Sequence, residues 1–256
     1  SAEDRLAAGD NPTIAALHET HPLRDGISPS QPQRFKVERP KSSFASWYQF
    51  FPRSEGAYYG EDGKIVPGNL KTSIAGLERA AAEGFNIVYL PPIFPIGVTN
   101  RKGRNNSLVA GPNDPGSPFG IGSELGGHDT VDPQLGTMDD FKAFCERAHE
   151  LGLEIALDFA LQCSPDHPWV KAHPNWFRTK PDGTIAFAEN PPKKYQDIYP
   201  IDFNADMEGI EKEVERIMDL WGKAGVTIFR VDNPHTKPVR FWQDVIAAVT
   251  KKHPEV

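Results

Sequence analysis

The chain has 256 residues, of which 38% are hydrophobic, so it is long enough for one large globular domain or two small ones. Its net charge of −7 argues against nucleic acid or an anionic membrane as the main partner, because both are bound by concentrated lysine and arginine. No apolar run approaches the roughly 18 residues of a membrane span, and the polar start does not resemble a signal peptide. Two cysteines without metal-ligand spacing fit a reducing compartment, so we expect a cytoplasmic protein.

The first part of the chain, residues 1–41, is polar and interrupted by prolines, and we interpret it as an approach segment or linker with one short helix at 12–19. The aromatic run at 44–51 then predicts a first strand, which ends before Pro52.

A helix that closes at a glycine and leads directly into a strand is expected three times. The helices and strands fall at 73–84 and 85–91, at 137–152 and 153–159, and at about 210–225 and 226–232. Thr137 and Asp140 have the spacing of a capping box at the start of the second helix. Repeated helix and strand units of this kind predict a parallel sheet with right-handed crossovers.

A fourth amphipathic helix is expected from about Pro238, and the sequence stops soon after it. The alternation of helix and strand in the preceding units predicts a fifth strand next, and a sheet that ended here would expose an apolar edge. We therefore interpret the sequence as a piece of a longer chain.

Two charges share one face of the last strand. Side chains alternate along a strand, so Arg230 and Asp232 point the same way at its carboxyl end. Ligands and catalytic residues gather at that end in α/β folds. A purely structural ion pair is the alternative.

Two connections are longer than ordinary loops, and both follow strand ends. The first insert covers residues 91–132 and the second covers residues 160–206. Aromatic side chains interleaved with polar ones, as in the second insert, suit a sugar, whose CH faces stack on rings while its hydroxyls need hydrogen-bond partners.

The run Gly225–His235, with Arg-x-Asp after a glycine and an apolar stretch, resembles the nucleophile strand of the α-amylase superfamily. The resemblance implies a (β/α)8 TIM-barrel fold in the α/β class, with a small domain inserted after the third strand. Residues 42–256 would then be the N-terminal half of the barrel, its first four βα units, with the insert at 160–206.

Three longer motifs, Trp47–Ser54, Glu189–Pro200 and Phe229–Pro238, resemble the maltosyltransferase branch of this superfamily. Gln162 and Cys163 stand where most members of the superfamily carry Asn-His, which weakens a plain amylase interpretation. The resemblance implies retaining transfer of a maltosyl unit from α-maltose 1-phosphate to the non-reducing end of an α-1,4-glucan. It implies no cofactor, and a homodimer at full length.

The resemblance also assigns roles to residues. Asp232 would be the nucleophile, supported by Arg230. The leaving phosphate would be bound by Lys193, Tyr195 and Asn233, with Asn190 as a weaker member, and maltose by Lys102, Gln162 and Asp197. Without the family, Lys102 and Lys193 would be solvated loop charges and Gln162 a loop-capping amide. The general acid glutamate and the second aspartate of the family would lie on strands after this sequence.

Metal binding is not expected. His128 and Asp129 resemble a hydrogen-bonded pair that shapes the first insert, and no third ligand has suitable spacing. Two other functions stay open: an α-glucan hydrolase or isomerase on the same barrel, and a catalytically silent glucan-binding fragment.

Overall fold

The computed structural model describes residues 1–22, 24–33, 35 and 37–256. Positions 23, 34 and 36 fall in the predicted approach segment, residues 1–41. The prediction for these three positions lies outside the described residues. The chain divides into two compact units, Ser1–Ser42 and Ser43–Val256.

The first unit contains two short helices, α1 (Ala2–Gly9) and α2 (Pro12–Thr20). The prediction of a helix at 12–19 is confirmed, and Asn11 caps it by accepting a hydrogen bond from the backbone N–H of Thr13. Sequence reasoning missed α1, and also α3 (Pro40–Ser43) at the boundary between the units.

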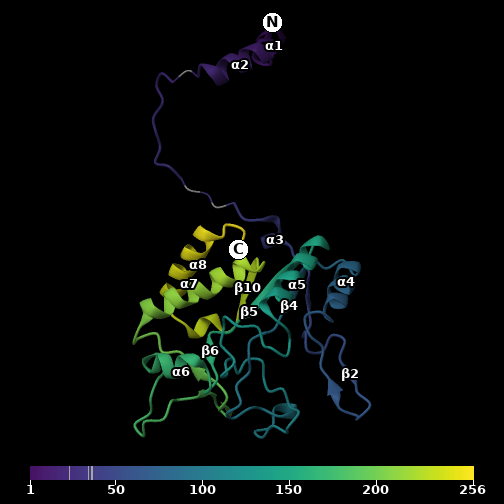
Figure 1. Cartoon of the computed structure of the whole chain (residues 1–256). Helices are drawn as coiled ribbons and strands as arrows, with labels where there is room; N and C mark the ends of the chain where they lie inside the picture. Colours follow the sequence, from purple (N-terminus) through teal and green to yellow (C-terminus); the bar gives the residue numbers. More distant parts are fainter. Residues whose placement is uncertain (23, 34, 36) are drawn as a thin grey trace. The chain divides into compact units, whose positions relative to one another are not determined.

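The second unit is organised by a four-stranded parallel sheet with the order β1-β4-β5-β10 (Figure 1). Its strands are β1 (Trp47–Gln49), β4 (Ile87–Leu90), β5 (Glu154–Phe159) and β10 (Ile228–Val231). The helices that alternate with them are α4 (Ile74–Ala82), α5 (Met138–Glu150), α7 (Met207–Lys223) and α8 (Val239–Lys252). The predicted repetition of helix and strand is therefore confirmed.

Local sequence signals explain the ends of these helices. The capping box of α5 is present, with Thr137 and Asp140 each accepting a hydrogen bond from the other's backbone N–H. Gly84, Gly152 and Gly225 all have positive φ after their helices, a conformation that glycine adopts without steric cost.

The first strand is shorter than the predicted 44–51. Among the described residues β1 pairs only with β4, in the register Trp47↔Ile87, so its ladder cannot extend beyond the start of β4. At its other end Phe50 leaves the ladder and buries its ring against Phe144 of α5. Packing of this ring into the core ends the strand before Pro52 does.

The core lies between the sheet and its helices. Trp221 of α7 is fully buried, its ring packs edge-on against Phe141 of α5, and its indole N–H donates to the carbonyl of His128 at 2.7 Å. This contact attaches the first insert to the helical layer.

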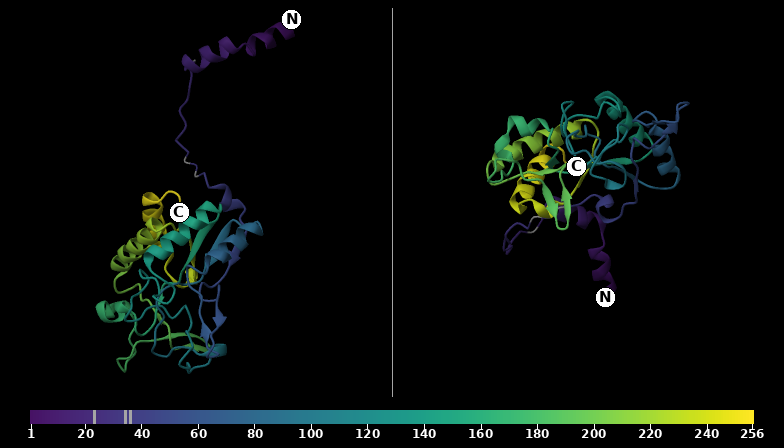
Figure 2. Two further views of the ribbon diagram at one scale, coloured as in Figure 1. Left: turned by 45° about the vertical axis from the view of Figure 1, so that its right-hand side comes forward. Right: turned by 90° about the horizontal axis from the view of Figure 1, so that it is seen from below.

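The loops that follow the strands gather in the lower part of Figure 1, and Figure 2 shows them from two other sides. Their regular elements are short. They comprise β2 (Tyr58–Tyr59) and β3 (Ile65–Val66) after β1, the 3-10 turn η1 (Arg104–Asn106) in the first insert, and η3 (Pro234–Thr236) after β10. The second insert contains β6 (Gln162–Cys163), α6 (Pro168–Ala172), η2 (Pro174–Trp176), β7 (Ala188–Asn190), β8 (Lys193–Tyr195) and β9 (Tyr199–Pro200).

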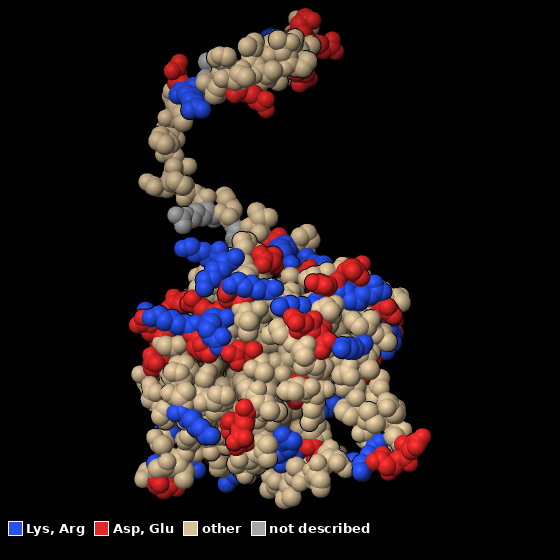
Figure 3. Space-filling model, viewed as in Figure 1, with Lys and Arg blue, Asp and Glu red and all other residues tan. Residues whose placement is uncertain are grey.

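Acidic and basic side chains are intermixed on the face shown in Figure 3 and form no single basic patch there. Across the described part of the chain, no helix combines the length and the apolar character that crossing a bilayer requires.

Candidate active site

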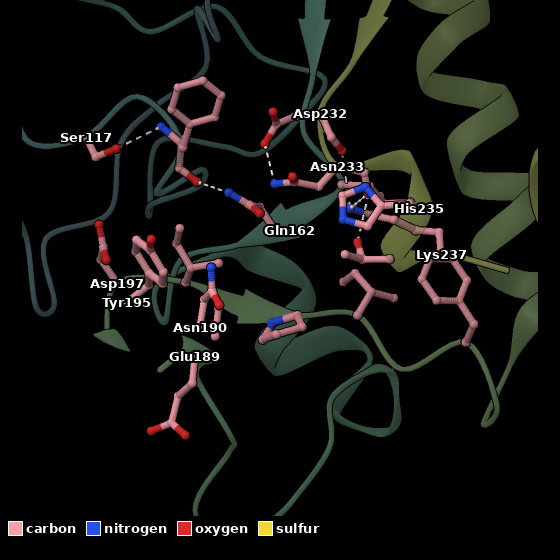
Figure 4. Close-up of a pocket in the computed structure, with 18 of the residues that line it drawn as sticks. Ser117, Gln162, Glu189, Asn190, Tyr195, Asp197, Asp232, Asn233, His235 and Lys237 are labelled. Atoms are coloured by element: carbon pink, nitrogen blue, oxygen red, sulfur yellow. Dashed lines mark hydrogen bonds between the residues drawn. The ribbon is translucent and has the colours of Figure 1, made fainter. Parts of the chain in front are cut away.

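A pocket of about 770 Å³ opens beyond the carboxyl ends of β5 and β10. Figure 4 shows the loop after β10 on one side, the β7–β8 hairpin on the other, and Gln162 between them. Of the predicted site residues, six line this pocket: Gln162, Asn190, Tyr195, Asp197, Asp232 and Asn233. These six lie on three segments that are distant in the sequence.

Arg230 and Asp232 make the contact that strand alternation predicts. The Nη1 atom of Arg230 lies 2.6 Å from Oδ1 of Asp232 and 3.0 Å from Oδ2 of Asp158. Asp158 reaches this guanidinium because the register of β5 and β10 places it opposite Arg230. One arginine thus joins a carboxylate at the pocket to one in the interior.

Asp158 is fully buried, and burial raises its pKa to about 6, although hydrogen bonds from Tyr89 and Arg230 oppose this rise. The Tyr89 hydroxyl donates a short hydrogen bond to Oδ2 of Asp158, while Oδ1 has no hydrogen-bond partner among the described residues. This carboxylate does not line the pocket, and its position suits it to orienting Arg230.

The turn after Asp232 is held in an unusual conformation. Asn233 has φ 47° and ψ 53°, in the left-handed region, and its amide donates to Oδ2 of Asp232 at 3.0 Å. The Lys237 ammonium lies 3.4 Å from the carbonyl oxygen of Asp232 and 3.2 Å from that of Asn233. Burial lowers the pKa of Lys237, which also lines the pocket.

The predicted phosphate ligands are only partly assembled. Asn190 and Tyr195 of the β7–β8 hairpin line the pocket together with Asn233. Lys193 is exposed on the same hairpin and is not among the lining residues. Lys193 and Tyr195 have the same parity along β8, yet only Tyr195 lines the pocket.

Two of the three predicted maltose ligands line the pocket and the third does not. Gln162 lines the pocket and donates from Nε2 to the carbonyl of Phe119 at 3.0 Å. Lys102 is only 5% exposed, bonds to Oε1 of Gln196 at 3.0 Å, lies 3.9 Å from Oδ1 of Asp197, and does not line the pocket. The alternative of a solvated loop charge is therefore wrong for Lys102. Burial raises the pKa of Asp197.

Sequence reasoning missed several lining residues, among them Asn106, Ser117, Glu189, His235 and Lys237. Glu189, His235 and Lys237 stand inside the motifs of the second insert and the last strand, but nothing local indicates which side chains of those motifs face the pocket; Asn106 and Ser117 lie outside the motifs. Ser117 sits in a glycine- and proline-rich tract, where it accepts a hydrogen bond from the backbone N–H of Phe119.

The predicted pairing of His128 with Asp129 is wrong. The ring nitrogens of His128 contact His167 and the carbonyl of Ala160, whereas Asp129 forms an ion pair with Arg216 of α7. The fold also brings Cys163 and His167 to His128, with one potential ligand atom from each residue within 4.8 Å of the others. Spacing along the chain cannot reveal this group, because its members come from both inserts.

Known proteins resemble this chain in both sequence and fold. No protein-family model matches the chain. It is 90% identical over its whole length to the α-1,4-glucan:maltose-1-phosphate maltosyltransferase of Bifidobacterium longum, and 80% identical to that of Bifidobacterium animalis subsp. lactis. It spans 34% and 35% of these two relatives, about a third of their length.

Among solved structures, an α-amylase from Lactobacillus plantarum matches with a TM-score of 0.63 and 30% sequence identity, over 82% of this chain and 43% of that one. Both the sequence and the fold therefore confirm the predicted resemblance: from end to end this chain is similar to one third of an α-1,4-glucan:maltose-1-phosphate maltosyltransferase, on an α-amylase type of fold.

Proposed function

We propose that the chain is part of a retaining glycosyltransferase that moves a maltosyl unit from α-maltose 1-phosphate to the non-reducing end of an α-1,4-glucan. The observation that carries the proposal is the position of Asp232, a carboxylate at a pocket of about 770 Å³, oriented by Arg230 and Asn233. The names of the close relatives supply the donor and the acceptor.

In the first step the Asp232 carboxylate would attack the anomeric carbon of the donor. The bond from that carbon to the phosphate oxygen breaks, phosphate leaves with the bonding electrons, and a β-maltosyl ester forms on Asp232. In the second step the 4-hydroxyl of the glucan end attacks the same carbon, loses its proton to a base, and frees Asp232. Two inversions restore the α configuration.

The pocket suggests how the donor would lie. Asn190, Tyr195 and Asn233 would donate hydrogen bonds to the phosphate, and Lys193 would have to turn inward from the exposed hairpin to join them. Gln162 and Asp197 would hold sugar hydroxyls, and Lys102 would act mainly by fixing Gln196 and Asp197.

For the fold, we propose that residues 42–256 form the first four βα units of a (β/α)8 barrel, with residues 160–206 as its inserted domain. The acid and base of the reaction would then come from the part of the relatives' length that this chain does not span. A cytoplasmic homodimer remains our prediction for the full-length protein.

An α-glucan hydrolase is the second candidate, favoured by the likeness to a solved α-amylase. Incubating the intact protein with α-maltose 1-phosphate and a malto-oligosaccharide separates the two. A transferase releases phosphate and extends the oligosaccharide by two glucose units per phosphate. Release of phosphate with free maltose and no extension would overturn the proposal.

A further inference from the structure

Two histidines from different inserts meet in the interior, and neither lines the pocket. His128 of the first insert is 1% exposed and His167 of the second is 2% exposed. We call them the histidine pair. Nδ1 of His128 lies 3.0 Å from Nε2 of His167.

The surrounding groups determine where the protons of the pair reside. The backbone N–H of Trp169 donates to Nδ1 of His167 at 3.0 Å, so the ring proton of a neutral His167 sits on Nε2. That proton points at Nδ1 of His128, which must accept it. The proton of His128 is then on Nε2, where it donates to the carbonyl of Ala160 at 2.9 Å. All four ring nitrogens are satisfied in one neutral arrangement.

A metal ion does not fit this arrangement, although Cys163 completes a group of three ligand types. To bind a metal, Nε2 of His167 would have to release its proton to Nδ1, where the N–H of Trp169 already points. Two donors would then face each other. Burial also raises the pKa of the Cys163 thiol well above its usual value, which opposes the thiolate that metals prefer.

The backbone is shaped around the ring of His167. A Cβ atom at Gly122 would lie 2.2 Å from Cδ2 of His167, and one at Gly127 would lie 2.5 Å from Nε2. The ring of Trp169 stacks on His128, with centroids 5.0 Å apart and an interplanar angle of 14°. The pair therefore occupies a fitted site between the two inserts.

The same junction supports one wall of the pocket. Oγ of Ser164 donates to the carbonyl of Gly122 at 2.5 Å, and Gln162 donates to Phe119 across the same two inserts. Gln162 and Phe119 both line the pocket. We refer to these two residues as the pocket wall.

We propose that His128 and His167 are positioning residues, a neutral and proton-ordered pair that fastens the two inserts and thereby fixes the pocket wall. A proton added to Nδ1 of His128 would face the Nε2 proton of His167 across 3.0 Å and would separate the inserts, and a proton added to Nδ1 of His167 would face the backbone N–H of Trp169 at 3.0 Å. This inference concerns the fold of the inserts and is independent of the proposed reaction.

Burial disfavours an added proton on the pair, and the charged groups nearby do not offset this effect. Asp129 on the same insert and Glu213 of α7 attract a positive charge on His128, but both carboxylates are engaged by Arg216 at 2.7 Å. Cys163 of β6 is a further titratable neighbour of the pair. Burial is the largest influence, and it lowers the pKa of His128 to about 4 and that of His167 further.

Nuclear magnetic resonance of the intact protein, labelled with ¹⁵N in histidine alone, tests the proton arrangement directly. At pH 7 we expect two buried histidines in the neutral Nε2–H form, with signals unchanged by one equivalent of Zn²⁺. An imidazolium or an Nδ1–H form at either position would overturn the proposal, and so would stoichiometric binding of Zn²⁺ by these rings.

Two substitutions separate the pair from the other hydrogen bonds of its members. Asn in His167→Asn can still accept from Trp169 but is too short to reach His128. Gln in His128→Gln can still donate to Ala160 but offers no ring acceptor to His167. The control is His173→Asn, which changes an exposed histidine of the same insert.

The readout for these variants is the side-chain amide signal of Gln162, which reports on the pocket wall. We expect both variants to shift or broaden it at pH 7, and the wild-type signal to change in the same way on acidification, while the control leaves it unchanged. A Gln162 signal that stays unchanged in folded His167→Asn and His128→Gln would overturn the positioning role. If either variant unfolds, the ¹⁵N measurement on the wild type still tests the proton arrangement, and the wild-type Gln162 signal on acidification still tests the positioning role.

Discussion

Two polar networks lie close together at the end of β5, and one is charged whereas the other is neutral. Asp158 belongs to a charged network with Arg230 and Asp232, whereas the carbonyl of Ala160, two residues later, accepts from a neutral histidine pair. Asp158 and His128 are about equally buried. Burial alone therefore does not decide the charge state. The difference is that Arg230 supplies Asp158 with a direct counter-charge, whereas no described residue contacts the histidines with an opposite charge.

The charged network should be essential for chemistry. Asp232→Ala removes the proposed nucleophile and no core volume, so we expect maltosyl transfer to fall by at least about 10³-fold with an unchanged unfolding midpoint. Initial rates of phosphate release measure the loss. Asp139→Ala, which removes an exposed carboxylate from α5, should keep full activity. Near-normal transfer by folded Asp232→Ala would refute the assignment.

The same network should depend on its counter-charge for stability. Arg230→Met leaves Asp158 buried without its cationic partner, and because the arginine is itself 39% exposed we expect the lower end of the known range, a loss of about 3 kcal/mol in unfolding free energy. Urea denaturation measures it. Adding Asp158→Asn to this variant should restore part of the loss, and a double variant no more stable than the single one would contradict the explanation.

A fall in pH should change the contributions of the two networks to stability in opposite directions. The lowered pKa of His128 means that its contribution to stability is complete above about pH 6.5 and is lost as the pH falls toward about 4, at most about 1.4 kcal/mol per pH unit. The raised pKa of Asp158 gives the reverse, a contribution that is present below about pH 3.8 and is lost as the pH rises through about 6.

Urea denaturation between pH 4 and 7 separates these effects through variants. The loss of unfolding free energy on acidification should be smaller in His128→Gln than in the wild type, and larger in Asp158→Asn. Equal pH profiles for His128→Gln and the wild type would show that the histidine is not neutral in the folded protein.

The smallest expected effect concerns the fit around the histidine pair. Gly127→Ala places a Cβ atom against Nε2 of His167, and overpacking of this kind costs about 1–3 kcal/mol. Thermal unfolding measures it. Gly9→Ala meets no atom within 4 Å and should be neutral or slightly stabilising. A stable Gly127→Ala would mean that the ring is free to move and is not fitted.

Local patterns along the chain predicted the strands of the parallel sheet and the helices that alternate with them. Apolar periodicity, the Thr137 capping box and the closing glycines act within a few residues of one another, so they can be recognised without tertiary structure. The alternation of side chains likewise placed Arg230 beside Asp232. Motif resemblance indicated the family, which the relatives confirm.

Local patterns could not predict how the side chains of the inserts are oriented, because their partners lie far along the chain. Lys102 bonds to Gln196, 94 positions away, and Lys193 lies outside the pocket that Tyr195 lines. His128 meets His167 instead of Asp129. The sequence by itself determined the order of the sheet strands and their alternating helices, and the charged strand end, since these depend on local periodicity. Only the tertiary structure decided which insert residues face the pocket and which remain neutral inside, since both depend on contacts between distant segments and on burial.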